Sequence, residues 1–156
     1  MKISEFLNKD AVCTDLKSET KMDVIVEMVT MLVDSGIIEK KHKNKIVEGL
    51  MAREALGSTA IGQGIAIPHT KSDAVTELIS ALAISKKGVK FDSLDGEPAY
   101  IFFLLIAPSD SAGPHLKALA RVSRLLKDKF FRDSLKNTKT AKEVMDLVSQ
   151  EDSRIG

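Results

Sequence analysis

Three side chains that can handle phosphate lie far apart in the sequence: Arg53, His69 and His115. His69 follows the apolar run Gly64–Pro68, where a strand is expected to end, and His115 follows a Gly-Pro pair at an expected helix start. A neutral imidazole is a nucleophile near pH 7, and a guanidinium offers a planar, permanently charged fork that matches phosphate oxygens. We therefore expect a phosphoryl site built from these three residues.

Each of these residues also has a simpler interpretation. A lone histidine is more often a surface residue than a nucleophile, as we expect for His42 between two lysines. In the simpler interpretation, Arg53 lies in the last turn of a helix and does no more than complement the helix dipole. His115 would likewise be an exposed residue at a helix start with no role in a site. A strand end in an α/β protein is a frequent site position, which favours a functional His69.

A metal site would be a rival use for two histidines. The sequence contains no short His-x-x-x-His or Cys-x-x-Cys cluster, so we expect no metal. The positive end of a helix should lower the pKa of His115 and keep its ring neutral, with one nitrogen donating and the other accepting.

The segment Gly57–Gly64 resembles a nucleotide-binding loop only in its glycines. A P-loop needs a lysine and a hydroxyl residue after its second glycine, to reach the phosphates and magnesium, and here Gln63 and Gly64 stand there. The segment also precedes a strand instead of a helix. We interpret it as a glycine-rich turn and expect no nucleotide or other cofactor. It could still present the Ser58 and Thr59 hydroxyls, with backbone N–H groups, to a small anion.

Composition narrows the class of protein. With 156 residues, 44% hydrophobic and 29% charged, the chain is expected to form one soluble domain over 1–156. A net charge of +1 gives no basic field for nucleic acid or an anionic membrane. The most apolar stretch, Tyr100–Ala107, is far shorter than the roughly 20 residues of a spanning helix, so we expect no membrane insertion. The single cysteine, Cys13, and an N-terminus without a signal-peptide pattern indicate a reducing, cytoplasmic location.

Hydrophobic spacing predicts alternating helices and strands. We expect an α/β sandwich with a central mixed sheet of about five strands flanked by helices. A capping pattern from Thr20 to Asp23 should start the first helix. The predicted helices are 22–32, 41–55, one from Pro114, 128–135 and 140–148. The predicted strands are 65–68, 78–85 and 100–107, with a candidate edge strand at 11–13. A turn is expected at Lys86–Gly88. The helix from Pro114 should bury Leu116, Leu119, Ala120, Ser123 and Leu126.

Four stretches, in this order and spacing, resemble one known family. They are Arg53-Glu54 with Gly57-Ser58-Thr59, the run Gly62–His69, Phe91–Pro98, and His115–Ala120. Together they resemble the enzyme IIA domain of the bacterial sugar phosphotransferase system, in the fructose/mannitol class that includes nitrogen-regulatory members. The resemblance covers about residues 3–148, and the glycine-rich stretch ending in Pro-His is its most specific part.

The resemblance implies an enzymatic role through a phosphohistidine. His69 would accept a phosphoryl group from the phosphohistidine of the carrier HPr and pass it to a cysteine of an enzyme IIB partner, while sugar enters through a membrane IIC component. His115 and Arg53 match the family's second active-site histidine and its arginine. Since this chain has no transmembrane helix and no IIB-type cysteine motif, IIB and IIC are expected as separate chains.

Two branches of the family stay open. Phe91–Pro98 and Leu119–Leu126 favour the fructose subgroup of transporter components. The alternative is a nitrogen-regulatory paralogue, which keeps the phosphorylation site and binds target proteins according to its phosphorylation state. The transported sugar is not readable, because the IIC component selects it.

Overall fold

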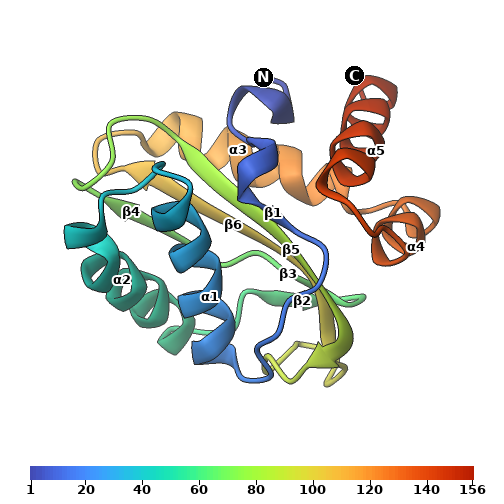
Figure 1. Ribbon diagram of the computed structural model, residues 1–156, viewed down its shortest axis with the longest axis horizontal. Coiled ribbons are helices and arrows are strands. Elements are labelled where there is room, and N and C mark those ends of the chain that lie inside the picture. The colour runs from blue at the N-terminus through green and yellow to red at the C-terminus, as the bar shows by residue number, and fades with distance from the viewer.

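The computed structural model describes residues 1–156 as a mixed sheet between two layers of helices (Figure 1). This confirms the expected single α/β domain, with six strands in the sheet. The helices are α1 (Lys21–Asp34), α2 (Lys43–Ala55), α3 (Ala112–Leu125), α4 (Lys129–Lys136) and α5 (Ala141–Arg154), with short 3-10 turns at Ile3–Glu5, Lys9–Ala11 and Lys40–His42. The strands are β1 (Val12–Cys13), β2 (Ala60–Gly62), β3 (Ile65–Ala66), β4 (His69–Ser72), β5 (Ile79–Val89) and β6 (Ala99–Pro108).

The sheet is organised around the long antiparallel pair β5 and β6, in the order β1-β5-β6-β3-β2. Strands β3 and β4 both lie parallel to β6 on the same edge, with Ile65 opposite Ile101 and His69 opposite Leu105. The chain therefore follows β6 twice, with a break at residues 67–68. Because of this break, a new short strand begins at His69 itself.

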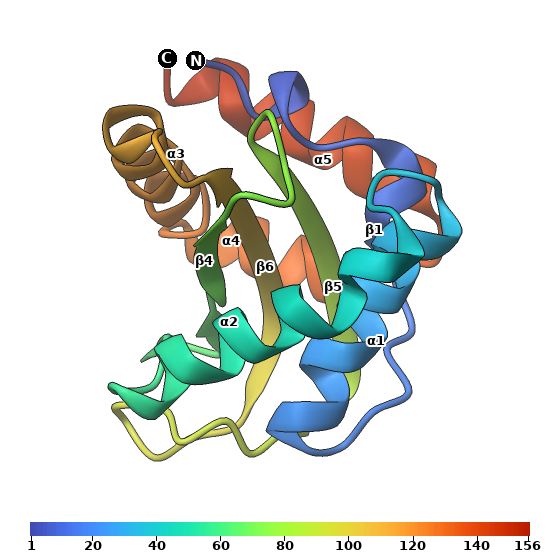
Figure 2. The same cartoon turned by 90° about the vertical axis from the view of Figure 1, so that its left-hand side faces the viewer.

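The two faces of the sheet bury separate hydrophobic cores. Along β6, Phe102, Leu104 and Ile106 pack with residues of α1 and α2, while the alternating residues Phe103 and Leu105 pack with residues of α3, α4 and α5. This is the period of two expected for a strand covered on both faces. Figure 2 shows α1 and α2 in front of the sheet, α4 and α5 behind it and α3 at its left-hand side.

Side-chain caps fix where several helices begin. The Thr20 hydroxyl accepts a hydrogen bond from the Asp23 N–H at 3.2 Å, as the capping pattern predicts for α1. Asp128 and Thr140 cap α4 and α5 in the same way, at 2.8 and 3.1 Å. None of the helices has the length and apolar character needed to cross a bilayer.

The turn expected at Lys86–Gly88 is wrong, because β5 runs on to Val89. The Lys86 ammonium donates to the carbonyls of Lys136 and Thr138, each at 2.7 Å, and so caps the C-terminal end of α4. Gly88 has φ +86° and lies so close to Tyr100 that an added Cβ would be 2.8 Å from the ring. These residues form an irregular stretch within a strand, with a register shift between Ile84 and Val89.

The expected buried face of the helix from Pro114 is also wrong by about one residue. The inward positions of α3 are His115, Ala118, Val122 and Leu125. Leu116 is 66% exposed instead. The prediction assigned the histidine to the phosphoryl site and left it out of the buried face, whereas its ring is one of the buried side chains of the helix. Of the five residues expected on the buried face, Leu126, just after the helix, is buried and Leu119 is half-buried. The other three are exposed.

Candidate active site

His69 is held at the first position of β4 by its neighbours in the sheet. The Pro68 carbonyl accepts a hydrogen bond from the Leu105 N–H at 2.9 Å, which attaches the chain to β6 immediately before the histidine. The His69 Nδ1 lies 2.8 Å from the Ile67 carbonyl oxygen. A carbonyl can only accept, so the ring is the donor and Nδ1 carries the proton. The other nitrogen, Nε2, is then left with a free lone pair, as a nucleophile requires.

His115 faces this ring from the first turns of α3. The two ring centroids are 5.4 Å apart and the rings are tilted by 53°. His115 is only 5% exposed, and its Nδ1 is buried without a hydrogen-bond partner. A buried N–H without an acceptor is rarer and more costly than an unused acceptor. The neutral ring is therefore best accommodated with its proton on Nε2, which makes that nitrogen a donor.

The pKa of His115 is lowered from its ordinary value of 6.5. Burial of the ring is the largest cause, followed by the charges of His69 and Lys71. The direction agrees with the sequence prediction, but the main cause differs, since the prediction invoked the helix end. The structure thus gives a neutral imidazole at this position near pH 7.

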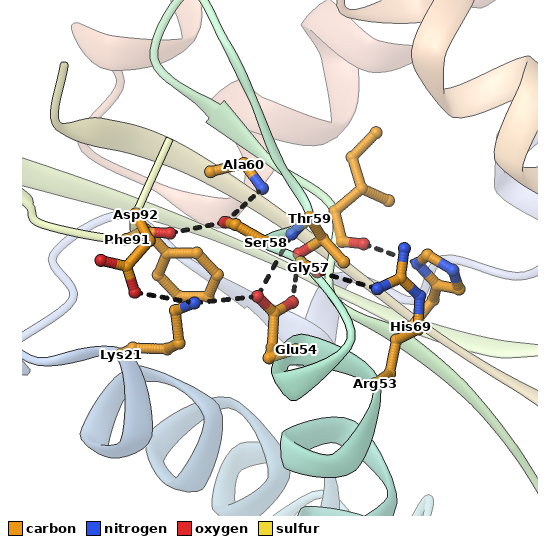
Figure 3. Close-up of polar contacts among 11 residues, drawn as sticks. Lys21, Arg53, Glu54, Gly57, Ser58, Thr59, Ala60, His69, Phe91 and Asp92 are labelled. Carbon is orange, nitrogen blue, oxygen red and sulfur yellow. Dashed lines mark hydrogen bonds and ion pairs between the residues drawn. The ribbon is translucent and has the colours of Figure 1, made fainter. Parts of the chain in front are cut away.

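Arg53 reaches the same place from the last turn of α2. One of its terminal nitrogens, Nη1, donates to the Gly57 carbonyl at 2.8 Å. The remaining N–H groups of the guanidinium are free to meet another acceptor. The structure therefore brings together all three residues that the sequence singled out, and Figure 3 shows Arg53 beside His69.

The three side chains line one open cavity of about 480 Å³, and they come from α2, β4 and α3. Its lining residues are Arg53, His69, Thr70, Lys71, Ala112, His115, Leu116 and Leu119. Two of these residues are permanent cations, two carry imidazoles and none is acidic. Such a cavity favours a small anion and offers it N–H donors from several directions.

Lys71 is a charged residue of this cavity that sequence reasoning missed. The expected strand ended at Pro68, and no element was predicted between His69 and the next expected strand at 78–85. In the structure they form β4, and residues two apart in a strand point to the same side. The spacing His69-x-Lys71 would have placed the ammonium beside the imidazole had this short strand been recognised.

Ser58 and Thr59, the other expected phosphate contacts, do not line the cavity. The Ser58 hydroxyl donates to the Phe91 carbonyl at 2.6 Å and accepts from the Ala60 N–H at 3.0 Å. The Thr59 hydroxyl donates to the Glu54 carboxylate. Both hydroxyls are engaged in holding the loop between α2 and β2 (Figure 3).

A scan of family models matches residues 5–151 to the phosphoenolpyruvate-dependent sugar phosphotransferase system, EIIA 2. The chain belongs to this family. It is therefore a phosphotransfer component that acts through a phosphohistidine. The chain is 38% identical over 152 residues to the fructose-specific EIIABC component of Bacillus subtilis. The aligned part is 97% of this chain but only 24% of that protein's length.

Solved structures of the family have the same fold. The nitrogen regulatory protein IIA-Ntr of Neisseria meningitidis superposes with a TM-score of 0.84 at 31% identity, over 94% of this chain and 98% of that one. Mannitol enzyme IIA of Escherichia coli, solved in complex with phosphorylated mannitol enzyme IIB, gives a TM-score of 0.77 at 22% identity over 92% and 96%. The relatives thus divide between sugar-specific and nitrogen-regulatory proteins, and the family alone does not choose between them.

Proposed function

We propose that His69 is the phosphoryl acceptor and that Nε2 is the nitrogen that carries the group. The observation that carries this proposal is the Nδ1–H bond to the Ile67 carbonyl, which leaves Nε2 unprotonated beside a cationic cavity. The donor is HPr, whose phosphohistidine supplies the group. The acceptor is a cysteine of an enzyme IIB partner that serves a membrane IIC protein on a separate chain.

The first step is an in-line exchange between two imidazoles. The lone pair of Nε2 forms a new P–N bond while the P–N bond of the donor breaks, and its electron pair returns to the donor ring. The His69 ring gains positive charge, which the Ile67 carbonyl dipole stabilises through Nδ1–H. In the second step a IIB thiolate attacks phosphorus and Nε2 leaves with its electron pair. Neither step requires proton transfer to or from Nε2.

Charge develops on the three equatorial oxygens of the transferring group. Arg53 and Lys71 supply fixed positive charge, and His115 supplies a neutral Nε2–H donor. Donors of this kind, already in place before reaction, are worth about 3–4 kcal/mol each. Because His115 is neutral, it stabilises these oxygens without neutralising them, so the group can still leave.

The test is direct labelling of the protein. Incubation with phosphoenolpyruvate, enzyme I and HPr should place one phosphoryl group on His69, as a phosphoramidate that is labile in mild acid and survives alkali. Mass spectrometry should locate the group, His69→Ala should remain unlabelled, and His42→Ala should label normally. Label on a serine, or none on a folded sample, would contradict the proposal.

We place the protein among transporter components for a fructose-like sugar, on two grounds: the 38% identity to the fructose-specific relative and the segment Phe91–Pro98. A second candidate is a nitrogen-regulatory role, in which the phosphorylated and free forms bind a target protein differently. The likeness to IIA-Ntr at a TM-score of 0.84, over nearly the whole length of both chains, favours that candidate.

A further inference from the structure

Glu54 is a buried carboxylate that follows Arg53 in α2 but does not line the cavity. Its exposed fraction is 5%. Carboxylates are almost never buried to this degree unless they are paired and hydrogen-bonded, because losing water is costly for a charge. The partners of Glu54 therefore indicate what this charge holds in place.

Two of its bonds go to a single residue of the following loop. Oε1 accepts the Thr59 N–H at 3.2 Å, and Oε2 accepts the Thr59 hydroxyl. The charge is balanced by Lys21 of α1, whose ammonium lies 3.2 Å from Oε1. Lys21 also lies 3.2 Å from the Asp92 carboxylate and 4.9 Å from the centre of the Phe91 ring. Glu54 is thus attached to α1 and to residues 91–92, and it fixes Thr59 (Figure 3).

From Thr59 a short series of hydrogen bonds reaches the candidate nucleophile. The Thr59 carbonyl accepts from the Ile67 N–H at 3.1 Å. The Ile67 carbonyl in turn accepts the Nδ1–H of His69 at 2.8 Å. At the other end of the same loop, the Gly57 carbonyl holds Arg53 at 2.8 Å. One loop, fixed by one buried carboxylate, therefore holds Arg53 directly through the Gly57 carbonyl, and holds the Ile67 peptide that orients His69 through the Thr59 carbonyl.

We propose that Glu54 is a positioning residue that sets the tautomer of His69. By holding Thr59 it holds the Ile67 peptide, and this peptide keeps the proton of His69 on Nδ1 and leaves Nε2 bare. Which nitrogen of a histidine carries the proton is set by the hydrogen bond that the other makes. The inference about the tautomer stands on these contacts, whereas its consequence for phosphoryl transfer rests on the proposed function.

The competing interpretation is purely structural. If Glu54 only stabilises the fold, replacing it lowers the stability and leaves the His69 ring as it was. If Glu54 positions the ring, a protein that is still folded must show a changed proton distribution on His69. The measurement that separates the two is the nitrogen-15 NMR spectrum of the His69 ring in the free, unphosphorylated protein, in buffer alkaline enough to keep the imidazole neutral.

Four variants are compared with the wild type. In Glu54→Gln one oxygen becomes an amide N–H₂, which cannot accept the Thr59 hydroxyl, and the charge that balances Lys21 is lost. Thr59→Val removes the hydroxyl alone, and Thr59→Ser retains it. Glu151→Gln is the matched control, since Glu151 is also a buried carboxylate, 8% exposed and bonded to Arg154 at 2.8 Å, but it lies in α5.

In the wild type we expect the Nδ1–H form of His69. Glu54→Gln and Thr59→Val should shift the ring toward the Nε2–H form, while Thr59→Ser and Glu151→Gln should match the wild type. The two shifted variants should accept phosphate from phospho-HPr about 10- to 100-fold more slowly, the usual effect of a small misplacement at a reacting group. Rescue by the conservative serine would show that the hydroxyl contact, and not merely the volume of the side chain, is responsible.

The wild-type tautomer in folded Glu54→Gln and Thr59→Val would overturn the inference, as would an Nε2–H ring in the wild type. Should Glu54→Gln fail to fold, Thr59→Val decides the matter, because it removes one hydroxyl and keeps Glu54 paired with Lys21. A shifted tautomer in the variants, together with no labelling of the wild type by phospho-HPr, would support the inference and contradict the proposed function.

Discussion

The two histidines of the cavity adopt opposite tautomers, with the proton on Nδ1 in His69 and on Nε2 in His115. His69 gives its Nδ1–H to the Ile67 carbonyl and keeps Nε2 bare. His115 has a buried Nδ1 without a partner, so its proton belongs on Nε2. The first ring is therefore suited to attack and the second to donate a hydrogen bond. Neither ring needs an unusual charge for its role, because in each case the environment of one nitrogen fixes the use of the other.

Arg53→Ala should slow the phosphorylation of His69 by about 10²- to 10³-fold, the usual cost of removing a donor from a site of this kind. Arg53→Lys should fall between this variant and the wild type, since lysine keeps the charge and loses the planar fork. The rate from phospho-HPr, measured by rapid quench, checks the order. Arg124→Ala is the control, because Arg124 is an exposed arginine in the last turn of α3. A wild-type rate for Arg53→Ala would show that Arg53 does not stabilise the transferring group and only forms its structural hydrogen bond with Gly57.

His115 should make the stability of the protein depend on pH. Its pKa is lowered on folding, so below about 6.5 the unfolded chain binds a proton that the folded chain resists. The stabilisation is therefore complete above that value and is lost as the pH falls toward the folded pKa. Urea unfolding from about pH 8 to about pH 5 should show this loss in the wild type. The loss should be smaller in His115→Gln, and an equal pH dependence in both proteins would contradict the assignment.

At the scale of elements, the site depends on how closely α2 approaches β4. Gly49 of α2 lies against Thr70, and an added Cβ would be 3.0 Å from the threonine hydroxyl. This approach brings Arg53, one turn further along α2, beside the strand that carries His69 and Lys71. On the other side, α3 brings His115. The cavity therefore has three walls: α2 and α3 are fixed by their core contacts, and β4 is fixed by its pairing with β6.

Gly49→Val should push α2 away from β4, because the added methyl groups meet the Thr70 side chain. We expect a loss of about 1–3 kcal/mol in the free energy of unfolding, typical of overpacking, and slower phosphorylation as Arg53 moves. Gly113→Ala is the control, since nothing lies within 4 Å of a Cβ there. Urea denaturation and the phosphorylation rate check both effects. Equal stability of Gly49→Val and the wild type would show that α2 does not need this close approach.

The sequence predicted the parts of this arrangement that leave a periodic signal. The class of fold, the long strands and α1, α2 and α4 were expected within a few residues of their bounds. The short strands β2 and β4 were missed, because three or four residues show no clear alternation. The last helix was expected to end at Val148, but it runs to Arg154. The apolar pattern missed its last turn because the buried residues there, Glu151 and Asp152, are charged and pair with arginines.

What was missed in the site has more than one physical reason. Arg53, His69 and His115 were recognisable from their types and their positions at element ends. Lys71 depended on the unrecognised strand β4, and Glu54 depended on contacts across the fold that no local spacing encodes. For Ser58 and Thr59, the residue types suited an anion, but the structure engages both hydroxyls elsewhere.

At the scale of the whole molecule, a buried ion pair connects the helix that carries His115 to both ends of the chain. Arg121 of α3 donates from Nε to the Asp152 carboxylate of α5 at 2.7 Å. The other carboxylate oxygen accepts the Ile3 N–H at 2.7 Å. Both side chains are nearly buried, with 12% and 4% exposed. The position of α3 therefore depends on α5 and on the first residues of the chain.

Arg121→Met should lower the free energy of unfolding by about 3–5 kcal/mol, because it leaves the buried Asp152 carboxylate without its partner. Lys142→Met, which breaks an exposed pair with Asp146, should cost less than about 1 kcal/mol. Urea denaturation measures both. The labelling of His69 should survive in Arg121→Met under conditions where it is folded, since Arg121 does not line the cavity. A near-wild-type stability would mean that the pair contributes no net stabilisation.

The branch of the family can be decided by following the phosphoryl group onward. The cavity is open, and the exposed Leu116 at its rim gives partners an apolar contact beside the reacting group. A transporter component should lose its phosphate within seconds to one enzyme IIB domain among those of the fructose, mannitol and related classes, and the group should then be found on sulfur. A regulator should keep its phosphate with all of them and capture a target protein in one phosphorylation state only.

Failure to isolate a stable complex with IIB would not count against transfer, since a carrier must release its partners and such interfaces are small. Retention of the label in the presence of every IIB domain would reject the transporter role.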